Sequence, residues 1–311
     1  MKAFLTILFL AAAVWAQPRG RTIAITIDDL PTVSTRDDIE SAREITTKLL
    51  EHIKTAGIPV IGFVNEEQVF DDAERDEDQV DLLQMWIDAG LELGNHTYSH
   101  RSLNEIPLAE YEADILKGEI VTKELLAKAG RPIRYFRHPY LQTGRSMQVK
   151  ADFDAFLKSH GYRVAPISFD DADYIFSKAY DLATDHGDTA LSKKVGDAYV
   201  PYMERKLLYW ERQSKRLFGR RISQTLLIHA NTINSIYLGD LLQMFKRRGY
   251  TFVDLDTALK DKAYELPDQY IGSAGISWLH RWALKKGKRF LTPNEPEVPP
   301  FVLKASGFTS E

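Results

Sequence analysis

The chain has 311 residues, of which 44% are hydrophobic and 27% are charged, and its apolar residues are spread along the whole length. This composition excludes disordered, collagen-like and coiled-coil proteins, and it allows one large domain or two small ones. The net charge of −4 leaves no basic surplus for binding nucleic acid or an anionic membrane surface. Because there is no cysteine, any metal must be held by His, Asp or Glu.

The first residues have the pattern of a secretory signal peptide. Lys2 supplies a positive charge, residues 3–15 are almost wholly apolar, and Val14-Trp15-Ala16 offers a cleavage site before Gln17. The apolar run is shorter than the roughly 20 residues that span a bilayer. We therefore expect residues 1–16 to be removed and the protein to be exported, either to the periplasm or out of the cell, without stable membrane insertion.

From there on, the chain alternates between helix-like stretches and short apolar strands. The expected strands are 22–27, 60–64, 91–94, 133–136, 163–167, 225–228 and 251–254. Five of them follow a helix-like stretch that ends at a glycine: Gly57, Gly90, Gly130, Gly161 and Gly249. Glycine just past a helix is a common stop signal because it adopts the left-handed conformation without strain. Strands that alternate with helices predict a parallel sheet with helical crossovers.

Two architectures fit this alternation, an open doubly wound sheet and a closed barrel. The first strand is followed by Asp28-Asp29-Leu30-Pro31 rather than by a glycine-rich dinucleotide fingerprint, which argues against a nucleotide-binding open sheet. We therefore predict a barrel-like ring of seven strands. Residues 174–221 are long, charged and helix-like, and we expect a helical insertion between the fifth and sixth strands. We interpret it as a helix pair packed on the barrel rather than as a wall of the substrate cleft.

Periodicity is lost after Asp256, and residues 263–311 form an expected C-terminal extension with an ordered aromatic cover at 270–282. The catalytic domain is expected to span 17–262.

Polar, titratable residues follow five of the expected strands. They are Asp28 and Asp29, His96 and His100, Arg137 to Tyr140, the carboxylates Asp170, Asp171 and Asp173, and His229. In parallel α/β folds the functional residues lie at the carboxyl ends of the strands. Each of these groups alone has an ordinary structural explanation, such as a helix cap, an ion pair or a surface histidine. Five such structural explanations would have to coincide at the carboxyl ends of strands in one sheet, which is much less probable than a single shared site.

These residue types predict metal-dependent hydrolysis. The spacing of His96 and His100 brings two imidazoles close enough to share a metal, and two His with one carboxylate leave a position open for water. A zinc ion lowers the pKa of that water from about 15.7 to about 7. The Asp of the pair that does not bind the metal can then act as base, and a His across the site can protonate the leaving amine. Arg137 would keep the base ionised, and a carboxylate would keep His229 protonated.

The same segments resemble the five ordered motifs of the polysaccharide deacetylases. They are Thr26-Ile27-Asp28-Asp29, the run from His96 to His100, Arg137-His138-Pro139-Tyr140, the run from Asp170 to Tyr174, and Leu227-Ile228-His229. The resemblance extends over about residues 22–254 and implies a distorted seven-stranded (β/α) barrel with a divalent metal, usually zinc. Because imidazole and carboxylate also accept cobalt and nickel, the residues do not choose among the three metals.

The resemblance also implies a role for each residue. Asp28 is expected to be the general base, and the metal ligands are expected to be Asp29, His96 and His100. Arg137 is expected to orient Asp28, and the Tyr140 backbone N–H to help hold the oxyanion. His229 is expected to be the general acid, and we favour Asp170 over Asp173 as the carboxylate that sets its charge.

The chain departs from the family pattern at two places. Leu30-Pro31 stands where the family has glycine after its Asp pair, and Tyr174 replaces a tryptophan. The expected activity is removal of N-acetyl groups from an aminosugar glycan of the peptidoglycan or chitin type. The alternatives are an O-acetyl esterase acting on a xylan-like polysaccharide and a non-catalytic glycan-binding homologue. The intact acid, base and ligand set argues against the last. The oligomeric state is not predicted.

Overall fold

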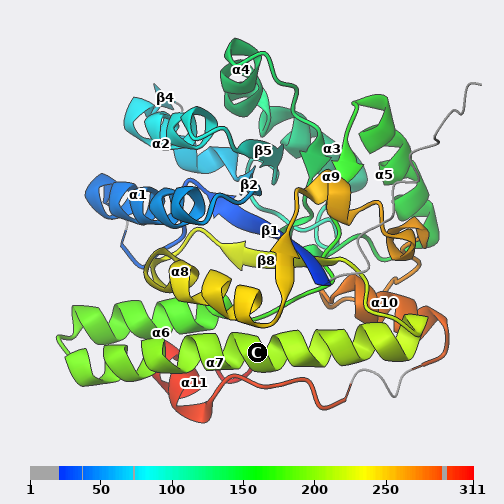
Figure 1. Ribbon diagram of the computed structural model, residues 1–311. Helices are drawn as coiled ribbons and strands as arrows, with labels where there is room; N and C mark the ends of the chain where they lie inside the picture. The colour runs from blue at the N-terminus through cyan, green and yellow to red at the C-terminus, as the bar shows by residue number, and fades with distance from the viewer. Residues whose placement is uncertain (1–20, 37, 73, 289–292) are drawn as a thin grey trace, which may run out of the picture.

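The computed structural model describes residues 21–36, 38–72, 74–288 and 293–311, so the expected signal peptide at 1–16 lies outside the described residues. Its centre is a parallel seven-stranded sheet (Figure 1). The strands are β1 (Arg21–Leu30), β2 (Val60–Val64), β5 (Glu92–Asn95), β6 (Tyr135–Phe136), β7 (Arg163–Val164), β8 (Gln224–His229) and β9 (Tyr250–Phe252). Each of the seven overlaps an expected strand, so the α/β class is confirmed.

The sheet curls into an incomplete barrel. Its order is β7-β6-β5-β2-β1-β8, and β9 pairs with the beginning of β1. On the remaining side a single parallel bridge joins Phe169 to Leu226. The expected fifth strand at 163–167 is shorter than predicted, because the chain leaves β6 after the Ala165 N–H bonds to the Phe136 carbonyl, and it then approaches β8. This gap makes the barrel distorted, as the resemblance implied.

Helices cover the outside of the sheet. They include α1 (Ile39–Ala56), α2 (Glu77–Asp88), α3 (Leu108–Lys117), α4 (Ile120–Lys128), α5 (Met147–Ser159), α8 (Thr232–Arg247) and the short α9 (Leu255–Ala258). Helix α1 shows how the sequence sets such boundaries: the Asp38 side chain accepts a hydrogen bond from the Ser41 N–H, and Gly57 ends the helix at φ 62°. The other four stop glycines also have positive φ.

The predicted insertion is a pair of helices, α6 (Asp173–Asp185) and α7 (Thr189–Phe218), which run beside α8 in Figure 1. The C-terminal extension is ordered around α10 (Trp278–Lys285) and α11 (Pro300–Ser306), and α11 packs on α6. The remaining elements are η1 (Glu66–Val69), η2 (Pro139–Leu141), η3 (Lys262–Glu265) and a small hairpin of β3 (Phe70–Asp71) and β4 (Glu74–Arg75), which the sequence analysis did not anticipate.

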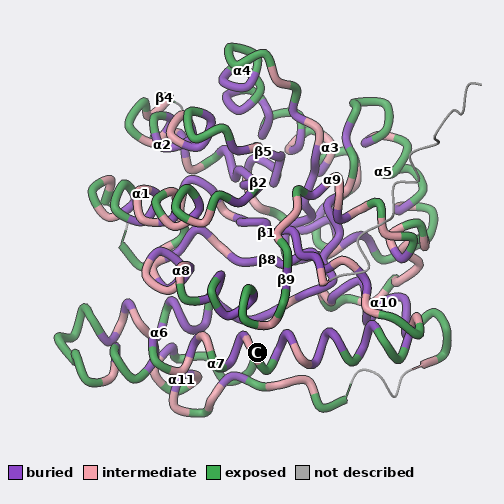
Figure 2. The backbone as a smooth tube through the Cα atoms, in the orientation of Figure 1, coloured by how far each residue is buried: buried purple, intermediate pink, exposed green. Residues whose placement is uncertain are grey.

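Burial follows from this arrangement. The alternating Ile23, Ile25 and Ile27 of β1 are almost fully buried, and so are the residues between them. A parallel strand covered on both faces reads as a continuous apolar run for this reason. Figure 2 shows the buried strands at the centre and exposed surface along the outer helices. Within the described residues, no helix is long and apolar enough to cross a membrane.

Candidate metal and hydrolytic site

The polar residues expected from the sequence meet at one end of the barrel, which we call the mouth and define as the carboxyl ends of the parallel strands. Asp28 and Asp29 lie near the end of β1, His96 directly follows β5, and His229 ends β8. Asp28 and His229 are partners in the β1–β8 ladder. Two residues 201 positions apart in the chain are therefore neighbours, because parallel strands place their carboxyl ends together.

Three side chains form a candidate metal site. One ligand atom from each of Asp29, His96 and His100 lies within 4.8 Å of the others. Asp29 Oδ1 is 3.5 Å from His96 Nε2 and 3.3 Å from His100 Nε2. These are the spacings of atoms that share one ion rather than of direct hydrogen bonds in good geometry. Two imidazoles and one carboxylate also match the ligand set of catalytic zinc sites.

Two further observations fit a metal at this place. Asp29 Oδ1 is buried and has no hydrogen-bond partner among the described residues. A buried oxygen without a partner is costly unless something else, such as a cation, satisfies it. His96 Nδ1 lies 2.8 Å from the Arg137 carbonyl oxygen. When Nδ1 carries the proton and donates to this carbonyl, the Nε2 lone pair faces Asp29, as a metal ligand requires.

The backbone around these ligands is held in an unusual conformation. Asp29, Thr97 and His100 have φ values of 60°, 69° and 53°. Such left-handed conformations cost about 1–3 kcal/mol each outside glycine and persist where neighbours impose them. The Thr97 N–H donates to Asn95 Oδ1 at 2.7 Å, and the His100 N–H donates to Thr97 Oγ1 at 3.0 Å. These bonds fix the turn that brings the second imidazole back toward the first.

Asp28 lies beside the candidate metal site and is held by Arg137. Arg137 donates to Asp28 Oδ2 at 3.1 Å and to Thr26 Oγ1 at 2.9 Å, and both charged side chains are buried. Burial raises the pKa of Asp28 to about 6, even though the charges of Arg137 and His229 lower it. Asp28 Oδ1 has no partner among the described residues, so this oxygen is free to accept a proton.

His229 lies across the mouth and is held by Asp173. Its Nδ1 is 2.7 Å from Asp173 Oδ1, and its backbone N–H donates to Asp173 Oδ2 at 2.8 Å. Asn231 and Asn234 donate to the same Oδ2 at 3.0 and 2.6 Å. Burial alone would lower the pKa of His229, but the charge and hydrogen bond of Asp173, together with Asp29 and Asp28, raise it to about 10.

Asp170, which we favoured from the sequence as the partner of His229, does not occupy that position. Its Oδ1 accepts from the Asp171 N–H at 3.1 Å, and burial raises its pKa to about 7. Asp173 takes the position because it is the first residue of α6, which starts against the end of β8. Sequence order alone does not tell which carboxylate of the run reaches the next strand.

Tyr140 lies on the metal side of the mouth, in η2. Its ring centroid is 4.5 Å from that of His100, and its side chain is exposed. Tyr140 and the next residue, Leu141, have φ values of 54° and 52°. Two consecutive left-handed residues require strong support from their surroundings.

The C-terminal extension supplies that support. The sequence analysis expected the extension to be ordered but did not predict its contact with the Tyr140 turn. A Cβ added to Gly275 would lie 1.7 Å from the Tyr140 carbonyl oxygen, so only glycine fits there. Gln142 Nε2 donates to the Ser273 carbonyl at 3.0 Å, and Arg281 donates to the Leu141 carbonyl. The only signal in the sequence was the glycines of the 270–282 segment.

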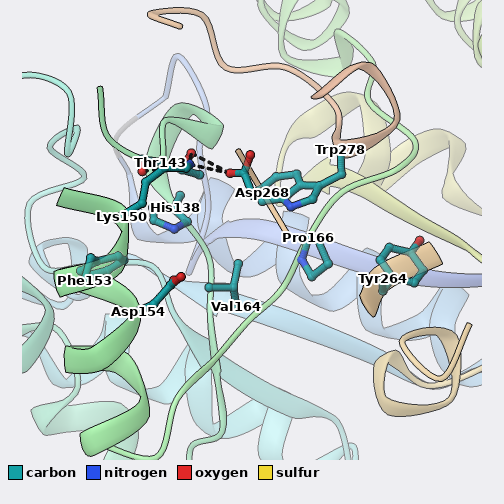
Figure 3. Close-up of a pocket in the computed structure, with 10 residues that line it drawn as sticks. All are labelled: His138, Thr143, Lys150, Phe153, Asp154, Val164, Pro166, Tyr264, Asp268 and Trp278. Atoms are coloured by element: carbon teal, nitrogen blue, oxygen red, sulfur yellow. Dashed lines mark hydrogen bonds and ion pairs between the residues drawn. The ribbon is translucent and has the colours of Figure 1, made fainter. Parts of the chain in front are cut away.

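The buried Arg281 is itself fixed by Asp268, at 2.7 Å. The same carboxylate accepts from Lys150 at 2.7 Å and from Thr143 at 2.9 Å. Figure 3 shows Asp268, Lys150 and Thr143 at the edge of a cavity of about 190 Å³ between α5 and the C-terminal segment. His138 also lines it, whereas the candidate metal ligands do not.

Part of the chain matches a known protein family. The polysaccharide deacetylase family model matches residues 16–165, a span that holds Asp28, the three candidate ligands and Arg137 but ends before Asp173 and His229. A peptidoglycan-N-acetylglucosamine deacetylase of Bacillus cereus is 30% identical over 118 residues, which are 38% of this chain and 36% of the relative. The match thus spans about a third of that relative's length.

Solved structures share the fold at lower identity. A chitin deacetylase from Colletotrichum lindemuthianum has a TM-score of 0.53 at 20% identity, covering 81% of this chain and 91% of that chain. A CE4 family pseudoenzyme from Bacillus anthracis also has a TM-score of 0.53, at 15% identity, covering 78% and 66%. The family model therefore identifies residues 16–165 as a polysaccharide deacetylase segment, and the solved structures show that the chain shares their fold.

Proposed function

We propose that the protein is a metal-dependent hydrolase that removes N-acetyl groups from an acetylated aminosugar glycan of the peptidoglycan or chitin type. The observation that carries the proposal is the pairing of an Arg-held carboxylate with an Asp-held imidazole on either side of the candidate metal ligands. The similarity to a peptidoglycan-N-acetylglucosamine deacetylase and to a chitin deacetylase supports this substrate class.

Asp29, His96 and His100 would hold the metal. When bound, a divalent ion lowers the pKa of a coordinated water and polarises the acyl oxygen. Zinc is the metal we propose, with cobalt and nickel accepted by the same ligand types. Fixing all three ligands on strand ends and tight turns keeps them ready for the ion without reorganisation.

Asp28 is the proposed base. Its pKa of about 6 leaves it ionised at neutral pH yet still able to take up a proton, which is the range that favours general base catalysis. Arg137 holds Oδ2, so Oδ1 is the atom that takes up the proton from the attacking water. Arg137 therefore acts as a positioning residue through Asp28.

His229 is the proposed acid. With its pKa raised to about 10 it is protonated at neutral pH, and Asp173 occupies Nδ1, so Nε2 is the atom that gives a proton to the leaving amine. The Tyr140 backbone N–H is the proposed oxyanion donor. Loss of one such donor typically costs about 10²–10³ in rate.

Acetate release tests the proposal. Purified protein is incubated with chitin oligomers, peptidoglycan and acetylated xylan in parallel, with and without a chelator. We expect acetate from the first two substrates, loss of release with chelator and recovery with added zinc. Release from xylan alone would replace the proposal by O-acetyl ester hydrolysis. Binding of glycan without release from any substrate would favour a non-catalytic homologue.

Export is a further part of the proposal. The pattern of residues 1–16 supports a cleaved signal peptide and a periplasmic or secreted enzyme, which suits a polymeric extracellular substrate. N-terminal sequencing of the protein purified from a secreting host should give Gln17 as the first residue. An uncleaved, membrane-associated product would contradict it.

A further inference from the structure

The cavity between α5 and the C-terminal segment has no role in the proposed chemistry. It lies beside β7, the edge strand of the sheet, at the side where the barrel is incomplete. Its volume is about 190 Å³, and a cavity of about 150 Å³ is enough to bind benzene. The apolar part of its wall is formed by Phe153, Val164, Pro166 and Trp278. A molecule built on one six-membered ring therefore fits.

Two polar groups at this cavity have no partner in the protein. His138 is 3% exposed, and its Nδ1 makes no hydrogen bond with any described residue. The Asp154 carboxylate also makes no hydrogen bond or ion pair within the described part of the chain. Figure 3 shows both groups directed into the same space, one from the chain after β6 and the other from α5. Because a buried polar atom without a partner is costly, this arrangement indicates a ligand that satisfies it.

The chemistry of these two groups selects a hydrogen-bond donor. Burial holds the pKa of His138 well below its usual value, so the imidazole is neutral and one of its nitrogens accepts. A carboxylate such as that of Asp154 only accepts, and it favours a positive charge. The cation in the lining, Lys150, is already engaged, because it donates to Asp268 at 2.7 Å and to the Thr143 carbonyl at 3.3 Å. The groups that remain open thus suit an ammonium ion rather than an anion.

The walls of the cavity are held in place without a ligand. The Trp278 N–H donates to the Ile167 carbonyl at 2.7 Å, and the Tyr264 hydroxyl donates to Ser168 Oγ at 2.9 Å. These bonds tie the C-terminal extension to the chain that leaves β7. Binding therefore requires little ordering of the protein.

One wall of the cavity is connected to the Tyr140 turn. Asp268 lines the cavity and accepts from both Lys150 and Arg281, each at 2.7 Å. Arg281 donates in turn to the carbonyl of Leu141, the residue directly after Tyr140. A positive charge in the cavity attracts Asp268 and so competes with Arg281 for it. The occupant can thereby act on the proposed oxyanion donor without touching the candidate metal ligands.

We propose that this cavity is a regulatory site for a small primary amine. The ammonium group pairs with Asp154, the ring fills the space between Phe153 and Trp278, and occupancy loosens the support of the Tyr140 turn. The binding site stands on the geometry of the cavity alone. Its effect on turnover rests on the proposed function, so the two are tested by separate measurements.

Calorimetry tests the binding site, with benzylamine as the probe and benzyl alcohol and benzoate as uncharged and anionic molecules of similar shape. We expect benzylamine to bind the wild-type protein at neutral pH, and the other two to bind at least about fivefold more weakly, because a partly exposed ion pair contributes up to about 1 kcal/mol. Absence of benzylamine binding would overturn the site. Tighter binding of benzoate than of benzylamine would also overturn it.

Three variants locate the bound amine. Asp154→Asn should weaken benzylamine binding about fivefold, and Val164→Phe should abolish it by filling the cavity from β7. Asp152→Asn is the matched control on the same helix, because Asp152 accepts from Gln148 at 2.8 Å and does not line the cavity. Its affinity should equal that of the wild type. Unchanged binding in both Asp154→Asn and Val164→Phe would place the amine elsewhere and reject the proposal.

Turnover of chitin oligomers by the zinc-loaded protein tests the regulation. Saturating benzylamine should lower kcat about threefold or more with little change in KM, because the oxyanion donor is displaced while the glycan still binds. In Val164→Phe the amine should have no effect; equal inhibition there would show that it acts at the metal instead. An unchanged kcat in the amine-bound wild type would reject the regulation. If the wild type releases no acetate without amine, the proposed function fails, and calorimetry still decides whether the cavity binds amines.

Discussion

At the scale of single residues, two buried titratable groups are tuned in different ways. Asp28 gains a high pKa from burial that its Arg137 partner only partly offsets, whereas His229 gains one from the charge of Asp173. The carboxylate is thus ready to accept a proton near neutral pH, and the imidazole is ready to give one. Two titratable groups whose surroundings fit one to accept a proton and the other to donate one are typical of hydrolytic sites.

The variant Asp28→Asn tests whether Asp28 acts as the base rather than as a metal ligand. The amide keeps the shape and can still contact Arg137, but it cannot take up a proton, so kcat should fall by about 10²–10⁴. Elemental analysis of the zinc-loaded variant should show unchanged metal content. His96→Ala and His100→Ala are the comparison, because each should empty the site. Loss of metal from Asp28→Asn would contradict the role we give it.

Asp173→Asn tests which carboxylate controls the acid. Without the charge at 2.7 Å, the pKa of His229 should fall, and the alkaline limb of the pH–rate profile should move to lower pH. Asp170→Asn is the matched control from the same loop. Its carboxylate accepts from the Asp171 N–H rather than from the imidazole, so this variant should leave that limb in place. A shift of the limb in Asp170→Asn alone would restore our first choice.

At the scale of elements, the C-terminal extension acts on the mouth from outside the barrel. It approaches the Tyr140 turn so closely that a glycine is required, and it binds the following carbonyl through Arg281. The strained turn is therefore maintained by a segment more than a hundred residues later in the chain. Sequence analysis recognised this segment as an ordered cover but did not connect it to the oxyanion donor.

Gly275→Ala should disturb that turn. The new methyl group would collide with the Tyr140 carbonyl, so the oxyanion donor should move and kcat should fall by about tenfold or more, with a smaller change in KM and no loss of zinc. Gly272→Ala is the matched control, because the three atoms nearest its added Cβ all belong to the Tyr270 side chain rather than to the Tyr140 backbone. Equal kinetic losses in the two variants would argue against a specific effect on the turn.

At the scale of the whole molecule, the described chain shares one main buried core, and polar groups are embedded in it. His138 is the clearest case: it is 3% exposed, and its Nδ1 has no partner among the described residues. Burial, assisted by the positive charges of Lys150 and Arg281, holds the pKa of His138 well below its usual value. The folded protein therefore keeps this imidazole neutral.

Stability should consequently fall in acid. Above a pH of about 6.5 the imidazole is neutral in both folded and unfolded states, whereas below it only the unfolded state takes up the proton. The free energy of unfolding should then drop by about 1.4 kcal/mol per pH unit from this residue. His138→Phe removes that dependence, so its Tm should change less than that of the wild type between pH 7.5 and 5.5. Parallel Tm curves would show that His138 does not titrate on unfolding.

The sequence by itself determined the strands, the glycine stops and the residues that carry the chemistry, because hydrophobic periodicity, left-handed glycines and polar groups after apolar runs are local signals. The expected placements of Asp28, Asp29, His96, His100, Arg137 and His229 at one mouth agree with the structure. Only the tertiary structure decided that Asp173 rather than Asp170 holds His229, that Gly275 and Arg281 support the Tyr140 turn, and that the Phe308 ring packs against the Tyr174 ring. Those contacts join segments far apart in the chain, and their geometry depends on how helices and the C-terminal extension pack, which no local pattern records.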